Sequence, residues 1–240
     1  MDVHLAAEGF NVKRLVEKGH FSEVYRSGST QLERLEYFNM DGVDLQTWNK
    51  RYLAGEFGYR EPDAFVMEAH TNYLQPLLPC SSTGLDLAGG AGHHAVWLAQ
   101  QRWRMTLLDG SEAALTIAQE KAAALPEDTK LETVQGAALD MITRFTEQQR
   151  RFGFVLVSFF LDRALLPLLP KIVEPNGLLL YRTYTVDNER LGNPRGPRNP
   201  EYLLQSQELL DVYRGMKILH YNETVAHKGV VEFIAQQGIS

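Results

Sequence analysis

The stretch of sequence that decides the fold is LDLAGGAGHHAVWLA, residues 85–99. Its first apolar residues belong to a predicted β-strand, which is followed by several glycines and then by the start of a helix. Glycines at such a turn let a ligand approach the backbone closely, because no side chain stands in the way. About 20 residues later a second predicted strand ends at Asp109, where a carboxylate can accept hydrogen bonds from both hydroxyls of a ribose. This spacing indicates a nucleoside cofactor.

Outward from this stretch, short β-rich segments alternate with helical ones, the pattern expected of βαβ units in a parallel sheet. The last two strands are joined only by NETVAHKG, which is too short for a crossover helix and predicts an antiparallel hairpin. We therefore predict an α/β fold with a doubly wound, mostly parallel seven-stranded sheet, order 3-2-1-4-5-7-6, and helices on both faces. The expected strands are 84–88, 104–109, 131–135, 154–158, 178–183, 216–221 and 230–235, and the expected helices are 92–101, 111–124, 138–149, 161–173 and 199–213.

The residues ahead of this core predict a helical cap. We expect two amphipathic helices, the first ending near Gly19 and the second opened by the capping-box pattern TQLE at 30–33. The chain is therefore divided into an N-terminal helical cap, 1–47, and a cofactor-binding core, 48–240. We interpret the cap as a lid over the site; the alternative is a packing element or the contact of a homodimer. The proline- and glycine-containing segment 191–200 is expected to be a loop near the site.

Composition and charge exclude several classes of function. The net charge of −6 and the absence of a basic cluster argue against a nucleic-acid partner. The longest apolar run, FVLVSFFL at 154–161, is much shorter than the roughly 20 residues of a membrane span. No signal-peptide pattern begins the sequence, so we expect a cytoplasmic protein without a membrane partner. The lone Cys80 cannot form an internal disulfide, and the histidines show no metal-ligand spacing, so no metal site is expected.

The glycine spacing alone does not identify the cofactor, because Gly90, Gly92 and Ala95 also satisfy a dinucleotide fingerprint. An NAD-dependent oxidoreductase therefore remains a rival, one that requires a proton relay such as a Tyr–Lys pair. Three features favour S-adenosylmethionine: Asp86 within the first strand, EPNGLLLY at 174–181, and the terminal hairpin. Together they resemble class I methyltransferases. In that family the glycine loop wraps the methionine part of the cofactor, an acid after the second strand holds the ribose, and residues after the third strand frame the adenine.

More closely, the chain resembles the tellurite-resistance type of small-molecule methyltransferase over about residues 48–235. The resemblance is carried by WNKRY at 48–52, EP at 61–62, LDLAGGAG, SFFLDRALLP and YRTYTVDNERLG. In that group the W-x-x-R-Y stretch lies over the amino-acid end of the cofactor. The cofactor-binding residues that these resemblances imply are Trp48, Arg51, Tyr52, Asp86, Ala88, Gly89, Gly90, Gly92, Asp109, Gly110, Gly136, Ala137, Ala138 and Ser158.

Three positions depart from the family pattern. Ala88 replaces the first glycine of the loop, and we expect it to need only a φ below zero. Ala137 stands where an acid often binds the adenine amine, so one hydrogen bond worth roughly 0.5–1.5 kcal/mol is lost. Arg182 stands where a glutamate is common. These departures leave two alternatives open: an enzyme that cyclises or cleaves S-adenosylmethionine without methyl transfer, and a non-catalytic binding partner.

Methyl transfer from a sulfonium is a one-step displacement, so the protein mainly positions and desolvates the nucleophile. Soft anions and thiolates attack without a base, whereas a hydroxyl or a protonated amine needs a proton acceptor. We predict transfer to a small-molecule acceptor, and the resemblance points to a thiol, selenium or tellurium species. The catalytic candidates at the carboxyl edge of the sheet are Arg163, Arg182 and Tyr184, with Phe160, Arg195, Arg198 and Asn199 nearby. For each arginine an ordinary ion pair is the favoured alternative, and His93 is expected to be solvated or hydrogen-bonded rather than a base.

Overall fold

The structure is a computed structural model of the chain. It describes residues 10–16, 21–26, 32–37, 45–126, 129–191, 196–197, 199–225 and 228–239, the first three ranges by their backbone alone.

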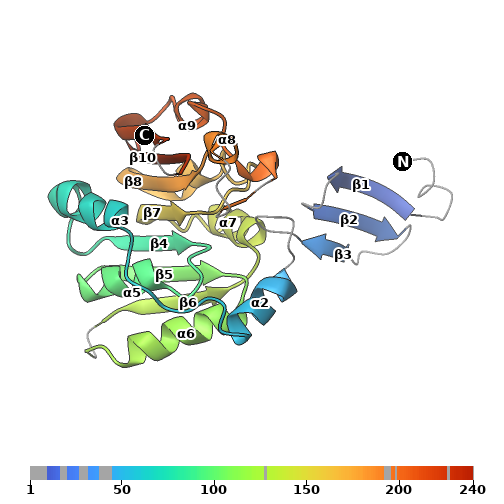
Figure 1. Cartoon of the computed structure of the whole chain (residues 1–240), viewed down its shortest axis with the longest axis horizontal. Helices are drawn as coiled ribbons and strands as arrows, with labels where there is room; N and C mark the ends of the chain where they lie inside the picture. The colour runs from blue at the N-terminus through green and yellow to red at the C-terminus, as the bar shows by residue number, and fades with distance from the viewer. Residues whose placement is uncertain are drawn as a thin grey trace.

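A seven-stranded sheet forms the centre of the core (Figure 1). Its order is β6-β5-β4-β7-β8-β10-β9, which is the predicted order 3-2-1-4-5-7-6 when the strands are counted from β4. The five strands from β6 to β8 pair in parallel, and β10 is antiparallel to both β8 and β9. The prediction of a parallel sheet with a terminal hairpin is confirmed. The strands are β4 (Thr83–Leu87), β5 (Arg104–Asp109), β6 (Leu131–Gln135), β7 (Phe152–Ser158), β8 (Val173–Tyr184), β9 (Lys217–Thr224) and β10 (Val230–Gln236).

Two apolar clusters, one on each face of the sheet, show that the sheet is covered on both sides. Successive residues of β7 alternate between them: Val155 and Val157 join one cluster, while Phe154 and Leu156 join the other. This alternation follows from the two-residue period of a strand. The first cluster also takes residues of α7 (Ala138–Glu147) and α9 (Glu208–Val212), and the second takes residues of α3 (Ala64–Ala69), α5 (His93–Gln100) and α6 (Glu112–Ala123).

Two of the predicted helices are wrong. Residues 161–162 are irregular, residues 163–168 form turns, and only η3 (Leu169–Ile172) is helical, as a 3₁₀ turn. Pro167 and Pro170 explain this, because proline lacks a backbone N–H and clashes with the preceding helical turn. The second expected helix, 199–213, is divided into η4 (Pro200–Tyr202) and α9, and Gln207 before α9 has a left-handed φ of 64°. The remaining elements are α2 (Leu45–Leu53), η2 (His70–Leu74), α4 (Gln75–Leu77) and α8 (Asp187–Arg190).

The expectation of a helical N-terminal cap is also wrong. Where it predicted helices, the structure has three antiparallel strands, β1 (Phe10–Val16), β2 (Phe21–Arg26) and β3 (Leu32–Tyr37). Each run is short, and glycine-containing segments separate them, which is the pattern of hairpins rather than of helices. Gly19 and Thr30, which were expected to mark helix ends, lie outside the described residues. The predicted boundary after residue 47 falls within α2.

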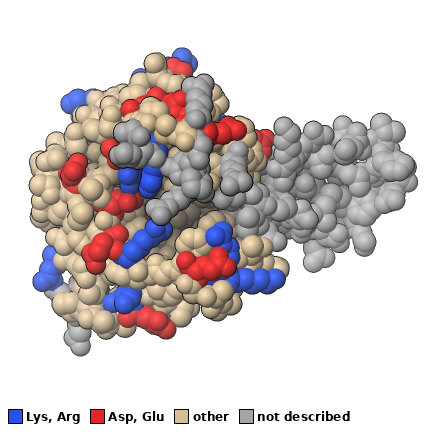
Figure 2. Space-filling model, in the orientation of Figure 1, with Lys and Arg blue, Asp and Glu red and all other residues tan. Residues whose placement is uncertain are grey.

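The charges on the core surface are mixed in sign. Figure 2 shows acidic and basic side chains interspersed over the face in view, without a large area of one sign. In the described ranges, no helix combines the length and the apolar character needed to cross a membrane.

Candidate functional site

The turn between β4 and α5 depends on residues in the left-handed region. Gly90 has a φ of 56° and Gly92 a φ of 73°. A Cβ atom on Gly90 would lie 2.3 Å from the Tyr52 hydroxyl oxygen, and one on Gly92 would lie 2.8 Å from Cβ of Ala118. Larger residues at these two positions would therefore push Tyr52 away or separate α5 from α6.

The expectation that Ala88, the first residue of this turn, needs only a negative φ is wrong. Its φ is 54°, in the left-handed region, where a Cβ atom crowds the following carbonyl. The glycine that the family pattern has at this position would relieve that strain. The turn nevertheless forms, and Ala88 lies on the wall of the cavity described below.

The variant Ala88→Gly should be more stable than the wild type by about 1 kcal/mol, because a left-handed alanine costs more than the extra flexibility of an unfolded glycine. Urea unfolding followed by circular dichroism would measure the difference. The matched control is Ala99→Gly within α5, where the same change should destabilise the protein. Equal destabilisation by both changes would show that Ala88 is not strained.

Asp109 ends β5 and holds the glycine turn. Its Oδ2 accepts a hydrogen bond from the Gly90 amide at 2.8 Å, and its Oδ1 accepts one from the Ser111 amide at 2.8 Å. Burial raises the pKa of Asp109, while these backbone donors oppose that rise. The carboxylate also lines the cavity, at the place predicted for a ribose-binding acid.

Asp86, a predicted cofactor-binding residue, lies beneath the turn and does not line the cavity. It contacts the backbone of α5 and supports the turn from below. The residue is fully buried, and its Oδ2 accepts a hydrogen bond from the Ala95 amide at 3.1 Å. Burial raises the pKa of Asp86 to about 6. Gly89 packs directly on it: a Cβ atom there would lie 2.6 Å from the Asp86 carboxylate.

A cavity of about 660 Å³ opens at the carboxyl edge of the sheet, a volume in the usual range for small-molecule sites. Most of the predicted residues line it, and a further group was not foreseen. The predicted residues on its wall are Trp48, Arg51, Tyr52, Ala88, Gly89, Asp109, Gly110, Gly136, Ala138, Ser158, Phe160 and Tyr184. The predicted residues that do not line it are Asp86, Gly90, Gly92, Ala137, Arg163, Arg182 and Asn199. The unforeseen ones include Phe57, Arg60, Glu61, Asp63, His94, Phe159 and Lys228.

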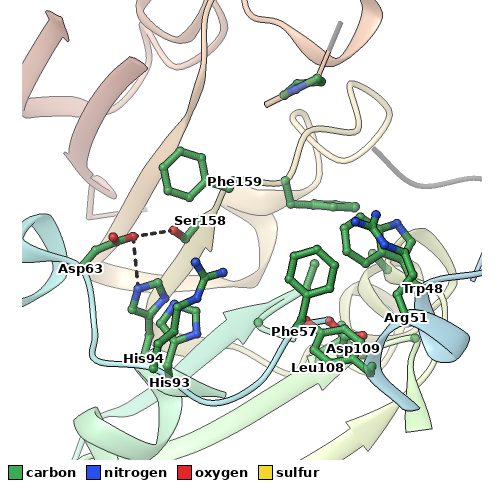
Figure 3. A pocket seen from close by; sticks show the side chains of 18 of the residues that line it. Trp48, Arg51, Phe57, Asp63, His93, His94, Leu108, Asp109, Ser158 and Phe159 are labelled. Atoms are coloured by element: carbon green, nitrogen blue, oxygen red, sulfur yellow. Dashed lines mark hydrogen bonds and ion pairs between the residues drawn. The ribbon is translucent and has the colours of Figure 1, made fainter. Parts of the chain in front are cut away.

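An aromatic group at one rim of the cavity comes from α2 and the segment after it (Figure 3). The ring of Phe57 lies 5.3 Å from that of Trp48 and 5.8 Å from that of Tyr52. Arg51 stacks on Trp48 and Phe57, and its Nε lies 2.8 Å from Oε2 of Glu56. The W-x-x-R-Y stretch is thus at the cavity, as the resemblance implies.

The side chain of Asn49 links this rim to the N-terminus of α6. Oδ1 of Asn49 on α2 accepts hydrogen bonds from the Ser111 hydroxyl at 3.0 Å and the Ala113 amide at 2.9 Å. Ser111 is the N-cap of α6, as predicted, because its Oγ accepts from the Ala114 amide. Asn49 therefore completes the capping of α6 from a distant part of the chain.

Asp63 is the centre of a charged cluster at the other side of the cavity (Figure 3). Its Oδ2 lies 2.9 Å from Nη1 of Arg182 and 3.4 Å from Nε2 of His94, and it accepts a hydrogen bond from Ser158 at 3.4 Å. Burial alone would raise the pKa of Asp63, but His94 and Arg182 hold it well below its usual range.

This cluster changes the role expected for Arg182. The guanidinium lies between Asp63 and Glu232, whose Oε1 is 3.2 Å from its Nε, and Cζ is 4.9 Å from the centre of the Phe159 ring. Arg182 does not line the cavity, and its ion pairs are those of the alternative favoured for it from the sequence.

The side chain of Arg163 is likewise held by an ion pair and by backbone hydrogen bonds. Its guanidinium pairs with Glu208 at 2.7 Å and donates to the Leu203 carbonyl at 2.9 Å and to the Glu201 carbonyl. It therefore ties the segment before α9 to the end of β7, away from the cavity wall. Among the catalytic candidates only Tyr184 lines the cavity, with its ring 4.8 Å from that of Phe159.

Several other predicted residues can now be placed. His93 lines the cavity, and burial, aided by His94 and Arg60, lowers its pKa to about 3, so its imidazole is neutral near pH 7. Asn199 caps η4 by accepting from the Glu201 amide. Arg195 and Arg198 lie outside the described residues. The sequence contains one Y-x-x-x-K spacing, Tyr213 and Lys217, but neither residue lines the cavity, so it provides no proton relay there.

Comparisons with known proteins agree with this geometry. Residues 85–174 match the family model of a methyltransferase domain. No curated protein matches the sequence. Three examples of solved structures that share the fold follow. TehB from Haemophilus influenzae has 16% identity and a TM-score of 0.58 over 79% of this chain and 67% of that one. The glycopeptide N-methyltransferase MtfA, solved with S-adenosyl-L-homocysteine, has 19% identity and a TM-score of 0.52. The match covers 76% of this chain and 92% of the MtfA chain. The [4+2]-cyclase SpnF has 14% identity and a TM-score of 0.59. The match covers 82% of this chain and 97% of the SpnF chain.

Proposed function

We propose that the chain is a class I, S-adenosylmethionine-dependent methyltransferase that transfers the methyl group of this cofactor to a small-molecule acceptor, and the match of residues 85–174 to a methyltransferase-domain model supports this. The observation that carries the proposal is the carboxylate of Asp109, which ends β5 beside the glycine turn and faces a cavity of about 660 Å³. A ribose-binding acid and a backbone turn open to a ligand are the two features that such a cofactor needs at this edge of the sheet.

The residues present suit the cofactor. Ala88 and Gly89 offer the turn to its methionine part, Asp109 offers a hydrogen-bond acceptor to the ribose, and Gly136 and Ala138 leave room for the adenine. The bound cofactor supplies an electrophilic methyl group on a sulfonium. The protein positions the acceptor and excludes water, the two contributions that displacement requires.

The acceptor that we propose is a thiol, selenium or tellurium species. The resemblance of WNKRY, LDLAGGAG and SFFLDRALLP to the tellurite-resistance type of methyltransferase supports this choice. The chemistry is compatible, because soft anions need no base. Two of the catalytic candidates, Arg163 and Arg182, are held by carboxylates, and this supports a small acceptor without an extended anionic group.

The test combines binding with product analysis. Titration calorimetry should show that S-adenosylmethionine and S-adenosylhomocysteine both bind. Mass spectrometry of separate incubations with a simple thiol, a selenide and a telluride should show a methylated product and S-adenosylhomocysteine in equal amounts. Consumption of the cofactor without a methylated product would favour cyclisation or cleavage instead, and the absence of binding would overturn the proposal.

A further inference from the structure

The two arginines on the rim of the cavity, Arg51 and Arg60, differ in what already surrounds them. Both line the cavity. Arg51 is neutralised by Glu56 and lies against the rings of Trp48 and Phe57, at 4.7 Å and 4.5 Å from their centres. Its charge and the faces of its guanidinium are therefore already engaged within α2 and the segment that follows it.

Arg60 has no such partner. Within the described part of the chain, no carboxylate lies within 4.0 Å of its guanidinium, although Glu61 lines the same cavity. The other acid nearby, Asp63, is occupied by Arg182 and His94. Arg60 thus contributes an unneutralised positive charge to the cavity wall.

The position of this charge along the cavity follows from its neighbours. Arg60 acts electrostatically on the Tyr52 hydroxyl: burial raises the pKa of Tyr52 to about 12, Asp109 adds to the rise and Arg60 opposes it. It also acts on the imidazole of His93, the first residue of α5. Tyr52, whose hydroxyl lies over Gly90, and His93, which follows Gly92, flank the glycine turn, and both line the cavity together with Arg60.

The charges of the cavity are therefore arranged along the length of the proposed cofactor. Asp109, an acceptor for neutral hydroxyls, lies at the end of β5, and the glycine turn follows. Arg60 lies near that turn, where the amino-acid part of the cofactor would extend. A guanidinium is well matched to a carboxylate, because it can donate two parallel charge-assisted hydrogen bonds.

We infer that Arg60, rather than Arg51, binds the α-carboxylate of the cofactor's methionine portion. This inference rests on the proposed use of S-adenosylmethionine. Trp48, Arg51 and Tyr52 then form a wall of the pocket, which is the place that the resemblance gives them, and the cation that recognises the carboxylate lies nine residues beyond Arg51.

The test uses two ligands that differ only in this carboxylate, S-adenosylmethionine and decarboxylated S-adenosylmethionine. Titration calorimetry with Arg60→Ala should show a loss of affinity for S-adenosylmethionine of about 10- to 100-fold, the range expected for a hydrogen-bonded charge. Affinity for the decarboxylated ligand should remain within about twofold of the wild type, since the interaction that is removed is absent from that complex. Arg60→Lys should recover part of the loss.

Two further variants make the result specific. Arg151→Ala removes the same charge from the exposed residue before β7, at the opposite edge of the sheet, and should change neither affinity. Arg51→Ala should affect both ligands alike, because it alters the wall and not the carboxylate partner.

The inference would be overturned if Arg60→Ala weakened both ligands equally or if it weakened neither. It would also be overturned if Arg51→Ala produced the carboxylate-selective loss. A wild-type protein that binds neither ligand would instead refute the proposed function, so the two failures are distinguishable. Circular dichroism of each variant identifies any loss of folding, and Arg60→Gln then replaces a variant that does not fold.

Discussion

Asp109→Ala should reduce the affinity for S-adenosylmethionine by at least about 100-fold, because two hydrogen bonds to a charged acceptor are removed together. The loss has a second cause. Both carboxylate oxygens accept backbone hydrogen bonds, from Gly90 and Ser111, so the variant also releases the glycine turn from the end of β5. Titration calorimetry with S-adenosylmethionine and S-adenosylhomocysteine measures the effect on both forms of the cofactor.

Two controls separate binding from folding in this experiment. Asp211→Ala removes an exposed carboxylate of α9 and should leave the affinity unchanged. Asp109→Asn retains one acceptor oxygen and should fall between the wild type and the alanine variant. If Asp109→Ala is folded and binds the cofactor as tightly as the wild type, the ribose does not bind at the end of β5 and the placement of the cofactor is wrong.

Arg182→Met should lower the free energy of unfolding by about 2–4 kcal/mol, because breaking a largely buried ion pair leaves its partners unpaired. Arg182 is 18% exposed by side chain and lies between Asp63 and Glu232, which are 30% and 24% exposed. Without the guanidinium these two carboxylates lose their shared cation, and Phe159 loses one of the two cations over its ring, Lys228 being the other. Urea unfolding near pH 7 measures the difference.

The pH dependence gives an internal check on the same variant. Since His94 and Arg182 depress the pKa of folded Asp63, its contribution to stability is present above the unfolded pKa, about 4, and is lost as the pH falls below it. The gap in stability between the wild type and Arg182→Met should therefore narrow from pH 7 towards pH 3. If the variant is as stable as the wild type but transfers methyl groups much more slowly, Arg182 acts on the acceptor, as the sequence suggested.

The sheet was predictable from sequence because its signals are local. Most of its strands contain a short apolar run, and the eight residues of NETVAHKG permit only a hairpin between the last two. The N-terminal strands were not predictable in the same way, since FNVKRLV and LERLEY contain helix-forming residues and register with neighbours decides their conformation. The strain at Ala88 was also hidden, because a residue type does not reveal a φ of 54°.

The half of the site that follows the strands in sequence was predicted, and the half that depends on distant contacts was missed. Asp109 and the glycine turn can be identified from the few residues around them in the sequence. Asp63 does not: its contact with Ser158 joins residues 95 positions apart. The sequence did mark Asp63, which follows Pro62 at the N-cap position of α3. In the structure its side chain makes no capping hydrogen bond and pairs with Arg182 instead.

The attachment of α2 has a consequence for how such an enzyme can diverge. None of the helix residues is buried, and Asn49 forms a polar link from the helix to α6. Replacing residues along α2 therefore leaves both apolar clusters of the sheet intact. Substitutions along α2 can therefore reshape the wall of the cavity that Trp48, Arg51 and Tyr52 form, while the strands of the sheet remain as they are.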